Sequence, residues 1–228
     1  MVSSVAVEEL ERKLEDVRRR IETAAARSAR NAREITLLAV TKKFPASVIE
    51  EAFELGVRDF GENYVQEFED KIPELASLQD ARFHLIGHLQ SNKSKVAASL
   101  FQVIQTVDSA KLARRLDGEG KALDVMIEVK LSPEESKAGA APESLDALVE
   151  AVRSCQNLKL AGLMTMPPWT DDAEPSRPYF ERLKKLADKY CLSQISMGMS
   201  HDFEVAIEEG STCVRIGTAL FGPRPQVK

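Results

Sequence analysis

The sequence contains little cysteine, histidine or tryptophan, and these residues form no metal-binding or redox pattern. The 228 residues include three cysteines, three histidines and one tryptophan. Cys155, Cys191 and Cys213 are far apart and odd in number, so they make neither a C-x-x-C pair nor a disulfide framework. Widely spaced thiols are typical of buried cysteines in a reducing cytosol. We therefore expect a cytoplasmic protein without a structural metal.

An excess of positive charge and long hydrophobic runs are also absent. The chain carries 31 lysines and arginines against 36 aspartates and glutamates, a net charge of −5. This balance argues against nucleic acid as the main partner. The N-terminal segment Met-Val-Ser-Ser-Val-Ala-Val-Glu-Glu lacks the charged and apolar regions of a signal peptide. Because no apolar run approaches bilayer-spanning length, we expect no membrane segment.

Eight apolar segments of strand length alternate with helical patterns. Repeated β-α units imply parallel strands with right-handed crossovers, and eight such units close into a barrel. The G-x-G-x-x-G fingerprint of the alternative, an open doubly wound sheet, does not follow the first strand. The expected strands are 35–43, 57–61, 82–87, 102–107, 124–130, 158–166, 194–199 and 213–221, and the expected helices between them are 46–55, 64–78, 91–100, 110–119, 142–154, 176–190 and 201–209.

Residues 5–30 predict a helix that precedes the barrel. Its apolar stripe has spacings of 4, 3 and 4 and consists of Leu10, Leu14, Val17 and Ile21. Such a stripe packs against a core and carries no chemistry of its own. The chain length fits one large domain. The sequence therefore predicts a single α/β domain over residues 1–228, a (β/α)8 TIM barrel with residues 1–34 as an N-terminal helix packed on it.

The functional interpretation starts from the first strand, Ile-Thr-Leu-Leu-Ala-Val-Thr-Lys-Lys at 35–43. Side chains alternate along a strand, so Lys42 shares a face with Leu38 and Val40, while Lys43 lies on the other face. Burial of an ammonium group is costly and favours the neutral amine, which attacks carbonyl groups. Alternatively, a lysine here extends its stem into water. The strand pattern does not choose between the two lysines.

In a TIM barrel, functional residues collect where the strands end. The residues near the eight predicted strand ends are Lys42, Asn63, His84, Asp108, Lys130, Met164, Ser200 and Arg215.

The loops after the last two strands predict a phosphate site. Ser200 offers a hydroxyl at the start of a helix, whose N-terminal N–H groups attract anions. Gly217 permits close backbone approach, and Thr218 adds a hydroxyl and an N–H group. The alternatives are a plain helix N-cap at Ser200 and a packing glycine at Gly217. Because the first and last strands are neighbours in a closed barrel, a ligand with an aldehyde and a phosphate would span Lys42 and this site. Pyridoxal 5'-phosphate (PLP) is such a ligand.

Several long motifs resemble the pyridoxal phosphate homeostasis family, in the same order and from about residue 35 to the end. They are Ala-Val-Thr-Lys at 39–42, Phe-Gly-Glu-Asn-Tyr-Val-Gln-Glu at 60–67, His-Leu-Ile-Gly-His-Leu-Gln-Ser-Asn-Lys at 84–93, Glu-Glu-Ser-Lys-Ala-Gly at 134–139, Gly-Leu-Met at 162–164, Ser-Met-Gly-Met-Ser at 196–200 and Gly-Ser-Thr-Cys-Val-Arg-Ile-Gly-Thr-Ala-Leu-Phe-Gly at 210–222.

The resemblance implies a barrel like the N-terminal domain of alanine racemase, with PLP as cofactor. It places the Schiff base on Lys42, not on Lys43, with Asn63 near it. It implies a ring-nitrogen contact from Arg215, and phosphate contacts from Ser200, Gly217 and Thr218. One departure concerns Lys130, where many family members carry asparagine.

His84 and Met164, near the ends of the third and sixth strands, complete the candidate cofactor contacts. His84 and His88 do not suggest a metal site, because four residues of extended strand separate them by roughly 13 Å. We expect His201 to be exposed in the first turn of a helix.

Two functions compete on these grounds. The first is a PLP carrier in vitamin B6 and amino-acid homeostasis, monomeric and without substrate turnover, that passes PLP to apo PLP enzymes. The second is a small PLP-dependent amino-acid racemase. Racemisation needs acid–base groups on both faces of the substrate carbon, and in alanine racemase a tyrosine of a second domain serves one face. Because the chain ends at Lys228, soon after the last motif, we expect no such domain and favour the carrier. A barrel enzyme that acts on phosphate substrates without a cofactor leaves the Lys42 motif unexplained.

Overall fold

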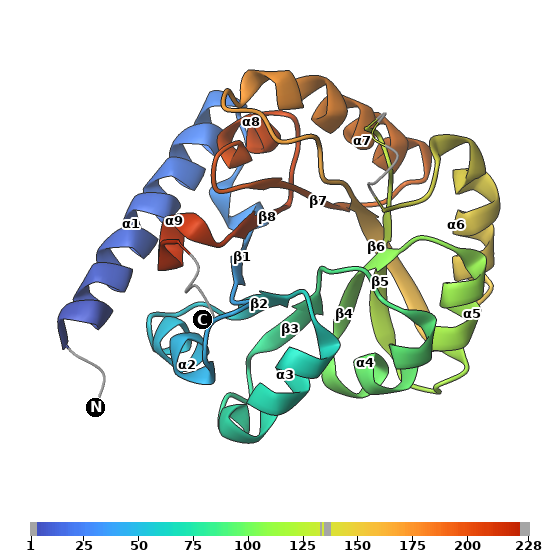
Figure 1. Cartoon of the computed structure of the whole chain (residues 1–228). Helices are drawn as coiled ribbons and strands as arrows, with labels where there is room; N and C mark the ends of the chain where they lie inside the picture. The colour runs from blue at the N-terminus through green and yellow to red at the C-terminus, as the bar shows by residue number, and fades with distance from the viewer. Residues whose placement is uncertain (1–3, 133, 135–137, 224–228) are drawn as a thin grey trace.

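The chain forms a closed barrel of eight parallel strands surrounded by helices (Figure 1). The computed structural model describes residues 4–132, 134 and 138–223. Neighbouring strands in the barrel are consecutive in the chain, and the last strand closes on the first. The strands are β1 Thr36–Val40, β2 Asp59–Glu62, β3 Arg82–Leu85, β4 Val103–Val107, β5 Leu123–Glu128, β6 Leu158–Met164, β7 Gln194–Met199 and β8 Cys213–Ile216.

Helices cover the outside of the barrel. The α-helices are α1 Ser4–Arg27, α2 Ala46–Glu54, α3 Val65–Lys71, α4 Ser94–Leu100, α5 Ala110–Asp117, α6 Leu145–Arg153, α7 Arg177–Lys189, α8 Phe203–Glu208 and α9 Thr218–Phe221. Short 3-10 turns accompany them at Ala32–Glu34, Ile72–Leu75, Ser91–Lys93, Pro142–Ser144 and Glu174–Ser176. The predicted TIM barrel is therefore confirmed, and the open sheet is excluded.

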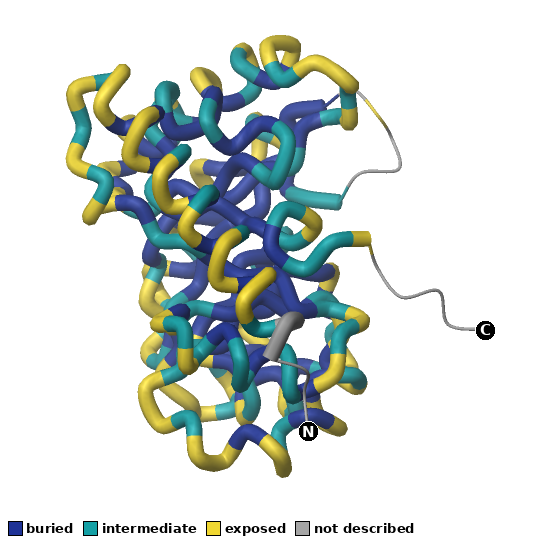
Figure 2. Tube along the Cα trace, turned by 90° about the vertical axis from the view of Figure 1, so that its left-hand side faces the viewer, coloured by how far each residue is buried: buried dark blue, intermediate teal, exposed yellow. Residues whose placement is uncertain are grey.

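The alternation of side chains in β1 determines what faces the barrel interior. Leu38 and Val40 form a small inner cluster with Ile86 and Cys213, whereas Ala39 belongs to the main core between strands and helices. Lys42, two residues beyond Val40, continues the inner face at the carboxyl end of the barrel. A tube coloured by burial shows the buried residues along the centre and the exposed ones at the periphery (Figure 2).

The N-terminal helix packs along the outside of the barrel against α8 and α9 (Figure 1). Its predicted apolar stripe is buried, and the side chains of Leu14 and Val17 are only 2% and 1% exposed. Arg20 donates two hydrogen bonds to Glu204 of α8, at 2.9 and 2.8 Å. The helix ends at Arg27, three residues earlier than predicted, because the backbone turns at Ala29 with a φ of 53°.

The end of the barrel differs from the prediction. The eighth strand stops at Ile216, and residues predicted as its continuation form the helical turn α9. Leu220 and Phe221 both donate their N–H groups to the carbonyl of Gly217, at 3.0 and 2.9 Å. The segment Ala-Leu-Phe is apolar throughout, and so short an apolar run fits a strand or a helix equally well. The eighth strand is thus followed by a helix, contrary to prediction.

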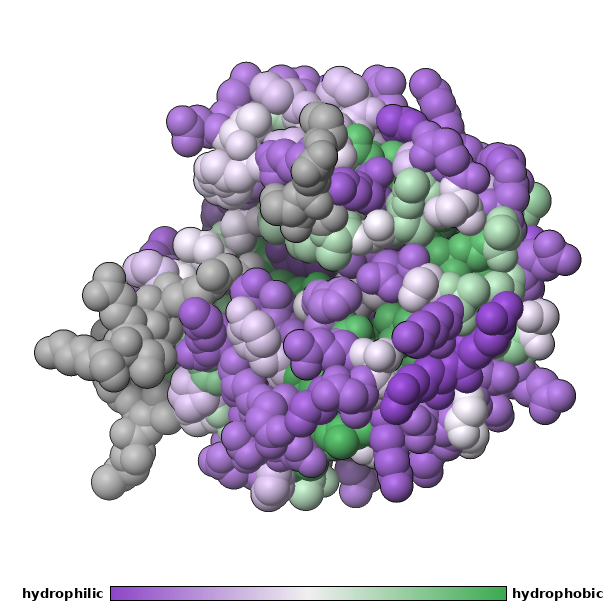
Figure 3. All heavy atoms as spheres, turned by 45° about the vertical axis from the view of Figure 1, so that its right-hand side comes forward, coloured by the Kyte–Doolittle hydropathy of each residue, from purple (hydrophilic) through white to green (hydrophobic). Residues whose placement is uncertain are grey.

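Within the described residues, no helix is long and apolar enough to cross a lipid bilayer. Figure 3 shows a face on which hydrophilic side chains predominate, with smaller hydrophobic areas between them.

Candidate functional site

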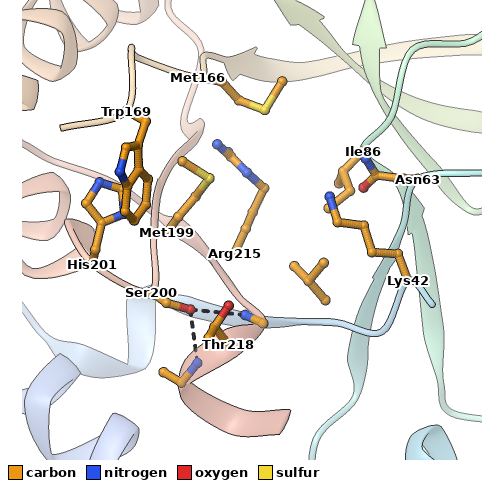
Figure 4. A pocket seen from close by; sticks show the side chains of 13 residues that line it. Lys42, Asn63, Ile86, Met166, Trp169, Met199, Ser200, His201, Arg215 and Thr218 are labelled. Atoms are coloured by element: carbon orange, nitrogen blue, oxygen red, sulfur yellow. Dashed lines mark hydrogen bonds between the residues drawn. The ribbon is translucent and has the colours of Figure 1, made fainter. Parts of the chain in front are cut away.

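A pocket of about 480 Å³ opens at the carboxyl ends of the strands. Figure 4 shows Lys42 and Asn63 on one side, Trp169 and His201 on the other, and Arg215 between them. The lining residues are Val40, Lys42, Asn63, Ile86, Met166, Trp169, Met199, Ser200, His201, Arg215, Gly217, Thr218 and Ala219. All the candidate cofactor contacts except His84 and Met164 therefore lie around one cavity.

Lys42 lies in a tight turn directly after β1. The N–H of Phe44 donates to the carbonyl of Thr41 at 3.1 Å, which closes the turn. Lys43 adopts a φ of 66°, a left-handed conformation that costs a residue with a side chain about 1–2 kcal/mol. Lys42 is half-buried and lines the pocket, whereas Lys43 is exposed and does not. Of the two lysines that the strand pattern left open, Lys42 is the one that faces the pocket.

A buried ion-pair network between β2 and α3 holds this turn in place. Lys71 Nζ, on α3, donates to Glu62 Oε1 at 2.8 Å, to Glu67 Oε1 at 2.7 Å and to the carbonyl of Thr41 at 3.1 Å. Glu62 Oε1 also accepts from the Thr41 hydroxyl, and Glu67 accepts from the N–H of Lys43. Burial raises the pKa of Glu62, while the charge of Lys71 opposes that shift. The network fixes both residues that flank Lys42.

The side of the pocket where the sequence predicts a phosphate is built by Ser200, Gly217 and the start of α9. Ser200 Oγ accepts hydrogen bonds from the N–H groups of Gly217 and Ala219, at 3.3 and 3.2 Å (Figure 4). A Cβ at Gly217 would meet Val40 at an ordinary 3.5 Å, so packing within the chain does not require glycine there. The helix predicted over 201–209 begins only at Phe203, and the helix whose N-terminus reaches this pocket is α9.

Arg215 is buried in the centre of the pocket floor and is held by two hydrogen bonds. Its Nη1 donates to Ser196 Oγ at 2.8 Å, and its Nη2 donates to the carbonyl of Thr165 at 2.9 Å. Burial lowers the pKa of the Arg215 guanidinium below its ordinary value, but a guanidinium remains protonated in proteins. The pocket therefore contains a fixed positive charge between the lysine side and the phosphate side.

The sequence interpretation missed the wall formed by Trp169 and His201. Their rings are in contact, with centroids 3.9 Å apart and planes tilted by 50°, and Trp169 remains 65% exposed. The side chain of His201 is only 16% exposed, so the expectation of an exposed histidine was wrong. The only signal was the position of both residues in loops after predicted strands, which in a barrel lie on the same face.

His84 and Met164 do not lie in the pocket wall. His84 faces the barrel interior and borders a different cavity at the opposite end, where its Nε2 lies 2.9 Å from Asp59 Oδ1. Met164 is completely buried, and Met166, two residues further along, reaches the pocket instead. Inward-facing residues of a strand lie at several depths, and the depth of each depends on strand register that the sequence does not specify. Lys130 also lies outside the pocket lining.

The residues present fit a ligand with an anionic end and a polar ring. The side chain of Asn63 carries a buried Oδ1 that has no hydrogen-bond partner among the described residues, and His201 Nδ1 is likewise buried without one, whereas His201 Nε2 lies 3.4 Å from Asp202 Oδ2. Buried polar atoms normally have partners, so such atoms in a pocket wall indicate a polar ligand. Ser200 and the N–H groups of α9 supply donors for an anion. No group of histidine, cysteine and acidic side chains in the described chain is arranged to hold a metal ion.

Comparison with known proteins identifies the family. The sequence profile of the alanine racemase N-terminal domain matches residues 13–225. The pyridoxal phosphate homeostasis protein of Pseudomonas aeruginosa is 46% identical over 211 residues, which cover 90% of this chain and 91% of that protein. This chain belongs to the pyridoxal phosphate homeostasis family. The family member of Aquifex aeolicus is 43% identical over 229 residues, which cover 96% and 98% of the two chains.

Solved structures agree with this family assignment. PipY of Synechococcus elongatus, solved with PLP bound, has a TM-score of 0.80 and 37% identity over 89% of this chain and 100% of its own. An alanine racemase of Clostridium difficile has a TM-score of 0.72 but only 14% identity, so it shows the shared fold alone. The match covers 96% of this homeostasis family chain and 58% of that racemase.

Proposed function

We propose that the pocket binds PLP, that Lys42 holds it covalently, and that the protein serves PLP and amino-acid homeostasis in the cytoplasm as a carrier. The observation that carries the proposal is the position of the Lys42 amine and of the α9 donors. They follow adjacent strands, β1 and β8, and face one cavity of about 480 Å³. When bound, PLP supplies an aldehyde that reacts with amines and a ring that accepts electrons.

The phosphate group would lie against Ser200, Gly217 and Thr218. The Ser200 hydroxyl and the backbone N–H groups at the start of α9 are uncharged donors, and the N-terminal end of a helix favours an anion. Their contribution would be directional, since several N–H and O–H groups would donate to the phosphate oxygens. Asn63 lies on the lysine side, where its side-chain amide is able to contact the ring or its hydroxyl group.

Arg215 would donate to the pyridine nitrogen. A protonated guanidinium has no acceptor atom, so the nitrogen opposite it stays unprotonated. An unprotonated ring accepts electrons less readily than one paired with a carboxylate. This arrangement supports storage of PLP and disfavours transaminase or decarboxylase chemistry.

One further observation supports a carrier over a racemase. No tyrosine is among the described residues that line the pocket, so the tyrosine that serves one face of the substrate in alanine racemase has no counterpart there. We propose that the carrier is a monomer and that its recipients are apo PLP enzymes.

The attachment site is tested by borohydride reduction of the protein after incubation with PLP. Mass spectrometry is expected to find the adduct on the peptide with Lys42. Lys42→Ala should lose the visible absorbance band, and Lys43→Ala is the matched control that should keep it. An adduct on Lys43, or no adduct at all, would contradict the proposal.

The carrier role is tested with the loaded protein and an apo PLP enzyme separated by a dialysis membrane or mixed directly. Activation of the acceptor is expected, together with no alanine racemase activity above that of Lys42→Ala. Racemisation that depends on Lys42, or failure to activate any acceptor, would reject the carrier role while leaving PLP binding intact.

A further inference from the structure

A continuous chain of hydrogen-bonded side chains crosses the barrel interior and ends at Arg215. Arg215 Nη1 donates to Ser196 Oγ at 2.8 Å, and Ser196 Oγ donates to Gln105 Oε1 at 2.6 Å. Gln105 Nε2 lies 3.0 Å from His84 Nδ1, and His84 Nε2 lies 2.9 Å from Asp59 Oδ1. The five residues come from strands β8, β7, β4, β3 and β2.

Every donor in this chain meets an acceptor when His84 is neutral. The Gln105 amide nitrogen can only donate, so His84 Nδ1 accepts. The remaining ring proton is then on Nε2 and is donated to Asp59. Burial lowers the pKa of His84, and the neighbouring Asp59 opposes this shift. The neutral ring required by the hydrogen-bond pattern is therefore also the form that burial favours.

The chain reaches solvent at its far end. Gln105 and Ser196 are completely buried, and His84 and Arg215 are 4% and 3% exposed. Asp59 is half-buried and borders a second cavity of about 330 Å³ at the amino-terminal end of the barrel. Arg82 and Cys213 also line that cavity. The two cavities thus lie at opposite ends of one polar path.

We propose that Asp59, His84, Gln105 and Ser196 are positioning residues that hold the Arg215 guanidinium in the pocket from the opposite end of the barrel. A guanidinium is planar, so two fixed partners define its plane. The Thr165 carbonyl supplies one, and Ser196, itself held by Gln105, supplies the other. Without Ser196, Arg215 retains one anchor and is free to rotate about it. The contact of Arg215 with PLP rests on the proposed function. The fixed orientation of the Arg215 side chain in the protein alone does not rest on it.

The first test uses the protein without PLP. Nitrogen-15 NMR measures the exchange of the Arg215 guanidinium protons with water. Ser196→Ala is expected to accelerate this exchange at least about tenfold, the factor that corresponds to one lost hydrogen bond. Ser211→Ala is the matched control, because Ser211 is also completely buried but donates to the backbone carbonyls of Met197 and Cys213 and not to the side chains that connect to Arg215. Equal exchange in Ser196→Ala and the wild-type protein would overturn the proposal.

The second test asks whether the half-buried end of the chain acts through Ser196. Asp59→Ala removes the acceptor of His84 at the rim of the barrel, so it also serves if Ser196→Ala does not fold. Asp59→Ala is expected to accelerate Arg215 exchange in the wild-type background and to add nothing in Ser196→Ala. Asp59→Asn keeps an acceptor oxygen and should restore slow exchange. Independent effects of the two substitutions, or no effect of Asp59→Ala, would show that Asp59 does not act on Arg215 through the hydrogen-bonded side chains.

A third measurement connects the chain to the pocket. Ser196→Ala is expected to weaken PLP binding about tenfold and to shift the pH midpoint of the visible band, whereas Ser211→Ala should do neither. Unchanged affinity and midpoint would remove the link to PLP. Absence of a visible band in the wild-type protein would reject the proposed function. The NMR results would still decide whether the hydrogen-bonded side chains hold Arg215.

Discussion

At the scale of single residues, Lys71 determines how the turn that carries Lys42 is held. Its ammonium group is buried between Glu62 and Glu67 and also bonds the carbonyl of Thr41. A buried charge that loses its partner is strongly destabilising, whereas replacement of both partners by neutral groups is often tolerated. The network is therefore sensitive to the loss of one member.

Lys71→Met is expected to lower the free energy of unfolding by about 3–5 kcal/mol, because it leaves Glu62 buried without a cation. Glu62→Gln combined with Lys71→Met should recover much of this loss. Lys185→Met is the control, since Lys185 is exposed and only 3.9 Å from Glu181, and its effect should stay below about 1 kcal/mol. Urea denaturation measures all four proteins, and a small effect of Lys71→Met would show that the ion pair is unimportant.

His84 makes stability depend on pH. Its pKa lies below the ordinary 6.5 in the folded protein, mainly because of burial. Between the folded and the unfolded pKa the unfolded chain binds more protons, so stability rises with pH in this window. Stability contributed by the neutral ring is complete above pH 6.5 and is lost as the pH falls below it. Thermal unfolding between pH 7.5 and 5 should show this decline, and His84→Gln should reduce it; identical profiles would exclude His84 as the cause.

At the scale of elements, the loop between β6 and α7 contributes the aromatic wall of the pocket. Trp169 is the only tryptophan in the sequence, and its ring contacts that of His201 at the pocket edge. Its fluorescence therefore reports on this wall alone.

PLP is expected to quench the fluorescence of Trp169 in proportion to pocket occupancy. The reason is the position of the indole in the lining of the pocket, beside His201 and Arg215 (Figure 4). A fluorescence titration should give the same midpoint as the visible absorbance, and Lys42→Ala should require more PLP. Fluorescence that does not respond while the visible band forms would place the ligand away from Trp169.

The sequence was sufficient to predict elements with a clear period and unable to predict those without one. The alternation in Gln194–Met199 identified β7 with its observed bounds. The apolar stripe of α1 identified the packed face, because four apolar residues recur at helical spacing between charged ones. The apolar run after Gly217 has no period, so α9 was predicted as strand. The sequence also did not predict how deep His84 lies in the barrel, since that depth depends on the register between strands.

The sequence predicted those site residues that lie near the ends of strands. Lys42, Asn63 and Ser200 follow strands, Arg215 lies near the end of β8, and the structure brings all four to one pocket. Trp169 and His201 come from loops whose path is determined by tertiary packing. No local pattern predicts such a path, so their pairing could be found only in the folded molecule.

At the scale of the whole molecule, α1 links the outer layer of the barrel to the Ser200 side of the pocket. It packs against α8 and against α9, and the N–H groups of Ala219 in α9 and of Gly217 just before it donate to Ser200. The helix thereby supports an element of only four residues that carries binding groups.

Leu14→Ala is expected to lower the free energy of unfolding by about 2–5 kcal/mol, as for other large apolar side chains removed from a core. Leu14 is 2% exposed and faces the barrel. Glu15→Ala, on the exposed face of the same helix, should change stability by no more than about 0.5 kcal/mol. Chemical denaturation distinguishes them, and equal effects would show that α1 is not part of the cooperative unit.

The contact between Ser200 and α9 bears on how long a ligand stays. The two N–H groups have an internal acceptor, the Ser200 hydroxyl, at 3.3 and 3.2 Å. A buried donor without a partner costs about 1–3 kcal/mol. If the proposed phosphate accepted from these two N–H groups, the Ser200 hydroxyl would accept from them again once the phosphate had left. The empty pocket would then keep its donors paired, which suits a protein proposed to give its ligand up.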